Sequence, residues 1–211
     1  MGSHELKSKS IGQLKGRWGV AIGTVFIAEL LPTLFVMVSL IIASLSPSVG
    51  VYSFLIIICF LLAIVLDSVL SVGKIKFFLN MTVDKETAMF SDLFSQLDLY
   101  LKATGITLLT GIITFIGTLL FIIPGIIFAY MYAQSLYVLV ENPEKSVAEC
   151  MYESRQIMKG HKFDLFCVQL SFIGWAILTA FTLYIGLLWL CPYMELTFAN
   201  FYLSLKKQPV A

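Results

Sequence analysis

Residues 51–72 read VYSFLIIICFLLAIVLDSVLSV, and Asp67 is the one charged side chain among them. A helix needs about 20 consecutive apolar residues to cross the hydrocarbon core of a bilayer. A helix that is apolar on every side has no polar face to turn toward water, as is typical of a membrane span. The stretch therefore predicts a membrane-spanning helix, and the charges on either side of it indicate how the rest of the chain is arranged.

All fourteen Lys and Arg residues fall into four blocks, and the long apolar stretches between the blocks contain none. Each of these stretches is long enough to cross a bilayer twice. The chain is 59% hydrophobic and 13% charged, whereas soluble domains contain roughly 25% charged residues, so the soluble class is excluded. The net charge of +1 gives no field that would attract nucleic acid. The four blocks lie within residues 7–17, 74–102, 145–162 and 206–207.

The pattern predicts an all-α fold, namely a polytopic membrane bundle of six transmembrane helices arranged as three hairpins. Pro192 leaves the start of the sixth helix open, because a proline either kinks a helix or begins one. The expected helices cover residues 18–43, 51–72, 103–121, 124–140, 163–183 and 185–205.

The distribution of basic residues also predicts the orientation of the chain. Cytoplasmic loops of membrane proteins carry an excess of Lys and Arg, so we expect the four basic blocks and both termini in the cytoplasm. The first four residues, Met1 to His4, resemble the remnant of an expression tag. The expected division is a tag remnant and cytoplasmic arm (1–13), one six-span membrane domain (14–205) and a cytoplasmic tail (206–211).

Two segments of the basic loops, residues 88–100 and 147–158, place apolar side chains at helical spacing. We expect two amphipathic helices, which either lie at the inner membrane interface or pack on the bundle as caps. The positions on these faces are Phe90, Leu93, Phe94, Leu97 and Tyr100 in the first segment, and Val147, Cys150, Met151, Ser154, Ile157 and Met158 in the second.

Three acidic residues, Glu29, Asp67 and Glu195, lie within the predicted spans. An ionisable group in a membrane helix costs about 2.5–3.5 kcal/mol on insertion scales, so it is a functional-site hypothesis by default. The hypothesis is a polar cavity, completed by Asn200 and Tyr193, that binds a cation, a proton or a polar headgroup. The alternative is structural: hydrogen-bonded carboxyl groups would join two helices, and Asp67 would pair with Lys74 or Lys76.

A second candidate site lies before the predicted fifth helix, where the side chains are basic. Arg155, Lys159, His161 and Lys162 would face the inner surface and contact anionic lipid or a partner, or would only anchor the helix. Searches for hydrolase, metalloprotease and nucleotide-binding motifs find none, and no cysteine pair has metal-ligand spacing. We therefore expect no enzyme activity, no metal and no cofactor.

The chain resembles a known family through three short motifs. They are Glu153-Ser154-Arg155-Gln156-Ile157-Met158-Lys159-Gly160-His161-Lys162, Ser171-Phe172-Ile173-Gly174-Trp175 and Ile123-Pro124-Gly125. Together they resemble the domain-of-unknown-function 975 family of bacterial integral membrane proteins. The resemblance implies a multi-span protein of the bacterial inner membrane, and it implies no activity and no catalytic positions.

These observations leave two functions open. The first is a non-enzymatic membrane protein that binds lipid, a membrane-active peptide or a partner membrane protein, for example in immunity or resistance to a secreted peptide. The alternative is a small transporter or channel in which Glu29 and Glu195 line the path. An oligomer is compatible with either function.

Overall fold

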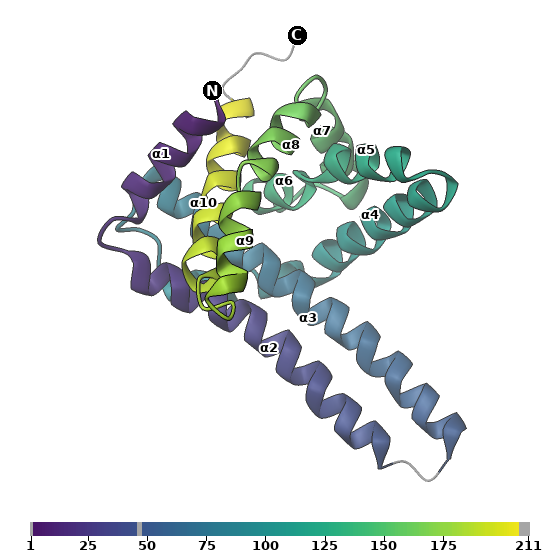
Figure 1. Cartoon of the computed structure of the whole chain (residues 1–211). Helices are drawn as coiled ribbons and strands as arrows, with labels where there is room; N and C mark the ends of the chain where they lie inside the picture. The colour runs from purple at the N-terminus through teal and green to yellow at the C-terminus, as the bar shows by residue number, and fades with distance from the viewer. Residues whose placement is uncertain (1, 46–47, 207–211) are drawn as a thin grey trace.

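The computed structural model describes residues 2–45 and 48–206, and every regular element in these ranges is a helix (Figure 1). The described ranges do not include Met1, Ser46, Pro47 or residues 207–211. The predicted tail, 206–211, therefore lies outside them except for Lys206. The α-helices are α1 (Ser3–Leu14), α2 (Trp18–Ser44), α3 (Val49–Val83), α4 (Tyr100–Leu120), α5 (Ile122–Tyr132), α6 (Ser135–Glu141), α7 (Val147–Ile157), α8 (Lys162–Leu170), α9 (Ile173–Phe181) and α10 (Leu187–Lys206). Two short 3-10 helices, η1 (Phe90–Phe94) and η2 (Leu97–Leu99), precede α4.

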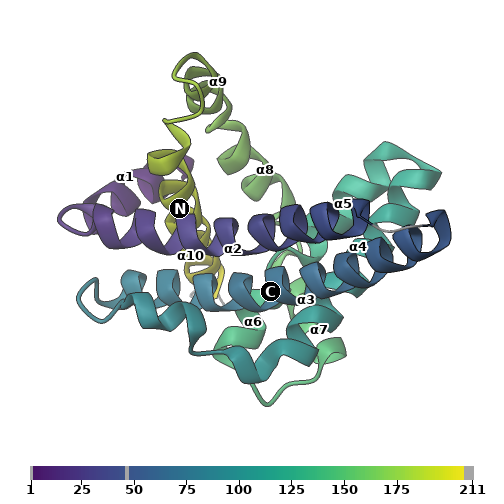
Figure 2. The ribbon, with the colours of Figure 1, turned by 90° about the horizontal axis from the view of Figure 1, so that it is seen from below.

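The helices diverge from a common base. Figure 1 shows α2 and α3 side by side in a long hairpin that projects from the body, and α4 and α5 in a second hairpin that points in another direction. Seen from below, α9 points to a third side (Figure 2). Helix α10 stands within the body and contacts α1, α2, α3 and α9. The base is therefore built around α3 and α10.

Five helical stretches are long and apolar enough to cross a membrane. Helix α10 is not among them, because its 20 residues include Glu195 and Asn200 as well as Pro192. The structure therefore supports the expected class, an all-helical membrane protein, and leaves the expected sixth span unconfirmed. The five stretches are Trp18–Ser44, Val49–Val83, Phe90–Leu120, Ile122–Glu141 and Lys162–Phe181.

The predicted end of the second helix at residue 72 is wrong, because α3 continues to Val83. Gly73, which marks that predicted end, lies inside the helix. A Cβ atom at position 73 would overlap the backbone oxygen of Leu93. Gly73 therefore allows η1 to lie directly against α3, and it does not end the helix.

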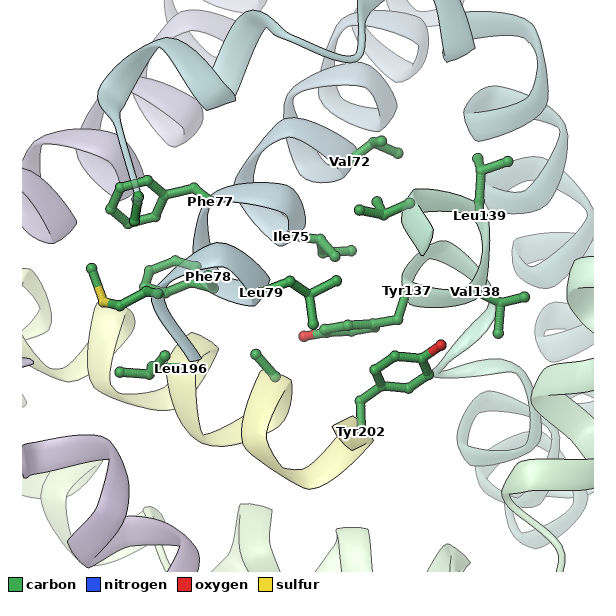
Figure 3. Close-up of a cluster of buried hydrophobic side chains, with 14 of the residues drawn as sticks. Val72, Ile75, Phe77, Phe78, Leu79, Tyr137, Val138, Leu139, Leu196 and Tyr202 are labelled. Atoms are coloured by element: carbon green, nitrogen blue, oxygen red, sulfur yellow. The ribbon is translucent and has the colours of Figure 1, made fainter. Parts of the chain in front are cut away.

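The last three turns of α3 supply much of the hydrophobic core. Figure 3 shows side chains of this segment facing α6 and α10. Tyr137 of α6 and Tyr202 of α10 stack there, with ring centroids 5.2 Å apart. Burial of these apolar side chains stabilises the helix beyond the predicted span. The contributing residues of α3 include Val72, Ile75, Phe77, Phe78 and Leu79.

One of the two predicted amphipathic helices is confirmed and the other is wrong. Helix α7 covers Val147–Ile157, and it buries Cys150, Met151 and Ser154 against the neighbouring helices. Residues 88–100 form η1 and η2 instead of one helix. Of the five predicted apolar positions only Leu93 is buried, and Leu99 is buried as well. The other four, Phe90, Phe94, Leu97 and Tyr100, are exposed.

Two predicted spans are broken in the middle. The helix expected over 124–140 divides at Gln134, where Ser154 Oγ accepts from the Gln134 N–H and donates to the Met131 carbonyl. The helix expected over 163–183 divides at Ser171, whose carbonyl accepts from Lys7 Nζ. Breaks at membrane depth are tolerated where other groups satisfy the freed backbone atoms.

The N-terminal arm is helical, which the sequence analysis did not predict. Helix α1 buries Leu6, Ser10 and Leu14, which are spaced four residues apart and so share one face. This face packs on α10, and α1 also contacts α8 (Figure 1). The arm is thus part of the folded base.

Candidate functional site: an acid–lysine cluster

Two of the three predicted intramembrane acids share one lysine. Lys74 Nζ of α3 lies 2.8 Å from Glu29 Oε1 of α2 and 2.9 Å from Glu195 Oε1 of α10. The Lys74 side chain is 12% exposed, whereas that of Glu29 is 61% exposed. The cluster is therefore enclosed around the ammonium group and open on the side of Glu29.

The extension of α3 brings the lysine to this position. Had α3 ended at residue 72, Lys74 would lie in a loop. Asp67 precedes Lys74 by seven residues, which places it on the same face of α3, about 10 Å along the axis. Asp67 is exposed and forms no ion pair with the described residues. The cluster with Asp67 holds three carboxylates and one ammonium group, so it is formally acidic.

Asn200 and Tyr193 do not join this cluster. At about 100° per residue, they lie roughly 140° and 160° around α10 from Glu195. The Asn200 amide donates to Ser10 Oγ (3.1 Å) and Gln13 Oε1 (2.7 Å) of the α1 region. Tyr193 packs edge-on against Phe172, with ring centroids 5.1 Å apart. In the structural alternative, hydrogen-bonded carboxyl groups join two helices; the structure instead pairs Glu29 and Glu195 with Lys74.

Lys74 is the residue of this site that sequence reasoning placed incorrectly. The basic block that it begins predicts a loop after the second span, whereas the structure places Lys74 within α3. The segment that follows, Ile75 to Leu79, is mainly apolar, and this continuation is the signal for a longer helix. The alternative pairing of Asp67 with Lys74 is not formed.

The second predicted site is an exposed turn between α7 and α8. Arg155 lies in the last turn of α7, and Arg155 and Lys159 are both exposed. His161 Nδ1 lies 2.8 Å from Asp164 Oδ2, so the histidine has a local partner. Lys162 begins α8. Residues 155–162 thus carry all four predicted residues on one short segment.

Among residues 2–45 and 48–206, no group of three or more His, Cys, Asp or Glu side chains is placed to hold a metal ion.

The comparisons with known proteins give one match. The family model described as "Protein of unknown function (DUF975)" matches residues 112–209. The matched range includes the turn between α7 and α8 and Glu195, and it does not include Glu29 or Lys74. The family resemblance is thus confirmed over this part of the chain. No curated protein and no solved structure matches.

Proposed function

We propose that this chain is a non-enzymatic, multi-pass protein of the bacterial inner membrane that binds another membrane constituent. Helix α10 serves as the sixth crossing, since its 20 residues extend about 30 Å, the thickness of the hydrocarbon core. The crossings form three hairpins, and the basic blocks and both termini face the cytoplasm.

The observation that supports this proposal is the apolar surface of the α2–α3 hairpin. Its outer part projects beyond the other helices (Figure 1), and Ile41, Phe54 and Phe60 there are each about 60% exposed. An apolar surface of this extent is covered in a membrane by lipid, by a peptide or by helices of a partner.

Site-specific photo-crosslinking in intact membranes tests the proposal. A photoreactive amino acid at position 60 is compared with one at position 152, where Tyr152 of α7 is equally exposed. We expect position 60 to form adducts enriched in one lipid, peptide or protein. Adducts that follow the bulk lipid composition at position 60 and show no peptide or protein would contradict binding.

One observation favours the alternative, a small transporter or channel. The fold brings Glu29 and Glu195 to Lys74, and Asp67 lies farther along the same face of α3. Intramembrane carboxylates of this kind mark proton and cation paths. Proton and potassium flux into proteoliposomes is compared for the wild type, Glu29→Gln and Glu195→Gln. Flux that both variants leave unchanged would remove these residues from any path.

A further inference from the structure

All three tryptophans of the chain line one cleft. Trp18 of α2, Trp175 of α9 and Trp189 of α10 surround a space of about 420 Å³. Ligand sites are typically clefts of about 300–1,000 Å³ with mostly apolar walls and a few polar groups. Here Thr179 of α9 and Thr182, the residue that follows α9, are the hydroxyl-bearing residues of the wall besides Tyr193.

A cation borders this cleft. Lys7 of α1 lies one turn before Ile11, which lines the cleft, and its Nζ is 4.1 Å from the ring centroid of Phe172. Phe172 packs in turn against Tyr193 of the cleft wall. Lys7 donates to the backbone oxygen and Oγ of Ser171, at 2.9 and 3.0 Å.

An ammonium group has three N–H donors, so Lys7 retains one beyond the two that Ser171 accepts. Within residues 2–45 and 48–206, Lys7 forms no ion pair with a carboxylate. Lys15 follows in the turn between Ile11 and Trp18, two residues that line the cleft, and it is exposed. The edge of an aromatic, apolar space is therefore positively charged.

We propose that this cleft binds one acyl chain of an anionic phospholipid, whose phosphate contacts Lys7 and Lys15. This inference rests on the lipid-binding form of the proposed function. Tryptophans are typical of the membrane interface, where headgroup phosphates lie. The charge of the edge selects an anionic lipid, and it would repel a cationic peptide.

Tryptophan fluorescence tests the proposal, because the emission of the whole chain comes from this cleft. The purified protein in neutral detergent is titrated with phosphatidylglycerol brominated on its acyl chains, and separately with equally brominated phosphatidylcholine. We expect saturable quenching, with half-saturation at a mole fraction about tenfold lower for phosphatidylglycerol, as a charge-assisted contact would give. Equal half-saturation for the two lipids, or quenching that only rises linearly, would overturn the proposal.

Three variants and one matched control locate the site. Lys7→Gln and Lys15→Gln each remove a positive charge, and Ile11→Glu adds a carboxylate at the edge. We expect each to weaken phosphatidylglycerol quenching at least about fivefold. Lys85→Gln removes the same charge from an exposed position in the loop after α3 and should leave the quenching unchanged. Elution profiles show that each variant is folded, and equal quenching of all four variants would contradict the assignment.

Two further outcomes separate this inference from its premise. Inorganic phosphate should not displace the brominated lipid, and displacement by phosphate alone would show an anion site without an acyl chain. If crosslinking at position 60 captures a defined partner while the cleft shows no headgroup preference, the proposed function stands and the cleft assignment fails. Headgroup-selective quenching without a partner at position 60 would instead support the cleft and contradict the hairpin as the binding surface.

Discussion

At the scale of single residues, Lys74 is the position on which the base of the fold depends. Its ammonium group lies between two carboxylates from two other helices and is largely enclosed. Breaking a buried ion pair by removing one partner is costly, because the remaining charge loses its compensation. Removal of Glu29 leaves Lys74 paired with Glu195, whereas removal of Lys74 leaves both carboxylates without a cation, so the two changes are not equivalent.

We therefore expect Lys74→Met to lower the free energy of unfolding by about 3 kcal/mol, and Glu29→Gln to lower it by less than half as much. Denaturation by SDS in mixed micelles measures both. Lys76→Met is the matched control, since Lys76 lies two residues away on α3 and forms no ion pair with the described residues. A loss for Lys76→Met as large as that for Lys74→Met would show that the cluster has no special role.

Gly73 gives a second prediction for a single residue. Any side chain at this position meets the backbone of Leu93, which cannot rotate away. We expect Gly73→Ala to destabilise the protein by about 3 kcal/mol, because η1 must move off α3. Gly111→Ala in α4 has open space around its Cβ position, and it should cost nothing or gain up to about 1 kcal/mol. Equal melting temperatures of the two variants in detergent would contradict the close approach.

At the scale of elements, the break between α5 and α6 depends on one hydroxyl group from another helix. Ser154 of α7 bonds to the Gln134 N–H at 3.2 Å and the Met131 carbonyl at 3.0 Å. Ser154→Ala leaves the buried Gln134 N–H and the half-buried Met131 carbonyl without this partner, at a cost of about 1–3 kcal/mol. Ser53→Ala of α3 removes only a bond within its own helix, and thermal unfolding should barely change. Equal melting temperatures of the two variants would contradict the role of the Ser154 hydroxyl at the break.

The start of α7 makes stability depend on pH. Two hydrogen bonds from Ser146, backbone N–H and hydroxyl, hold the pKa of the Glu149 carboxyl below its usual range. Because the folded-state pKa is the lower one, this stabilisation is complete above the usual value of about 4.3 and is lost as the pH falls through the folded-state pKa. We expect wild type to melt above Glu149→Gln at pH 6, and the difference to disappear in more acidic solution. A difference that persists unchanged at pH 3 would contradict the assignment.

An element could be predicted when the residues that determine it are close together in the sequence, and it could not when they are far apart. Helices α2 and α7 begin and end close to the predicted bounds, since a long apolar run and the helical spacing of apolar side chains are local signals. The breaks within the fourth and fifth predicted helices depend on Ser154 and Lys7, which lie 20 and 164 residues away in sequence from the backbone groups that they contact. No local pattern indicates such partners.

At the scale of the whole molecule, the sequence predicted only part of the candidate site, again because some of its contacts join residues that are far apart in the sequence. Glu29, Asp67 and Glu195 were identified because an acid in an apolar stretch is unusual whatever surrounds it. Lys74 was placed in a loop, since its position depends on how far α3 extends. Asn200 and Tyr193 were chosen by closeness in sequence, although the faces of α10 direct them away from Glu195.

The packing of α1 on α10 makes the number of crossings a measurable property. Helix α1 is mostly polar, yet it contacts α8 and the second half of α10. Six crossings require the turn between α9 and α10, which contains Tyr184, to reach the outer side. If α1 holds α9 and α10 near the inner surface, these two helices enter and leave the membrane on the inner side without crossing it. Both termini still lie on one side in that arrangement.

Labelling of single cysteines with a membrane-impermeant maleimide distinguishes the two arrangements. In a background with the four native cysteines replaced, Tyr184→Cys is compared with Val49→Cys at the tip of the α2–α3 hairpin and Lys85→Cys in the loop after α3. The proposed topology predicts that positions 184 and 49 react in intact cells, and that position 85 reacts only after permeabilisation. Reaction of position 184 only together with position 85 would reduce the crossings to four, because α9 and α10 would then enter and leave the membrane on the same side.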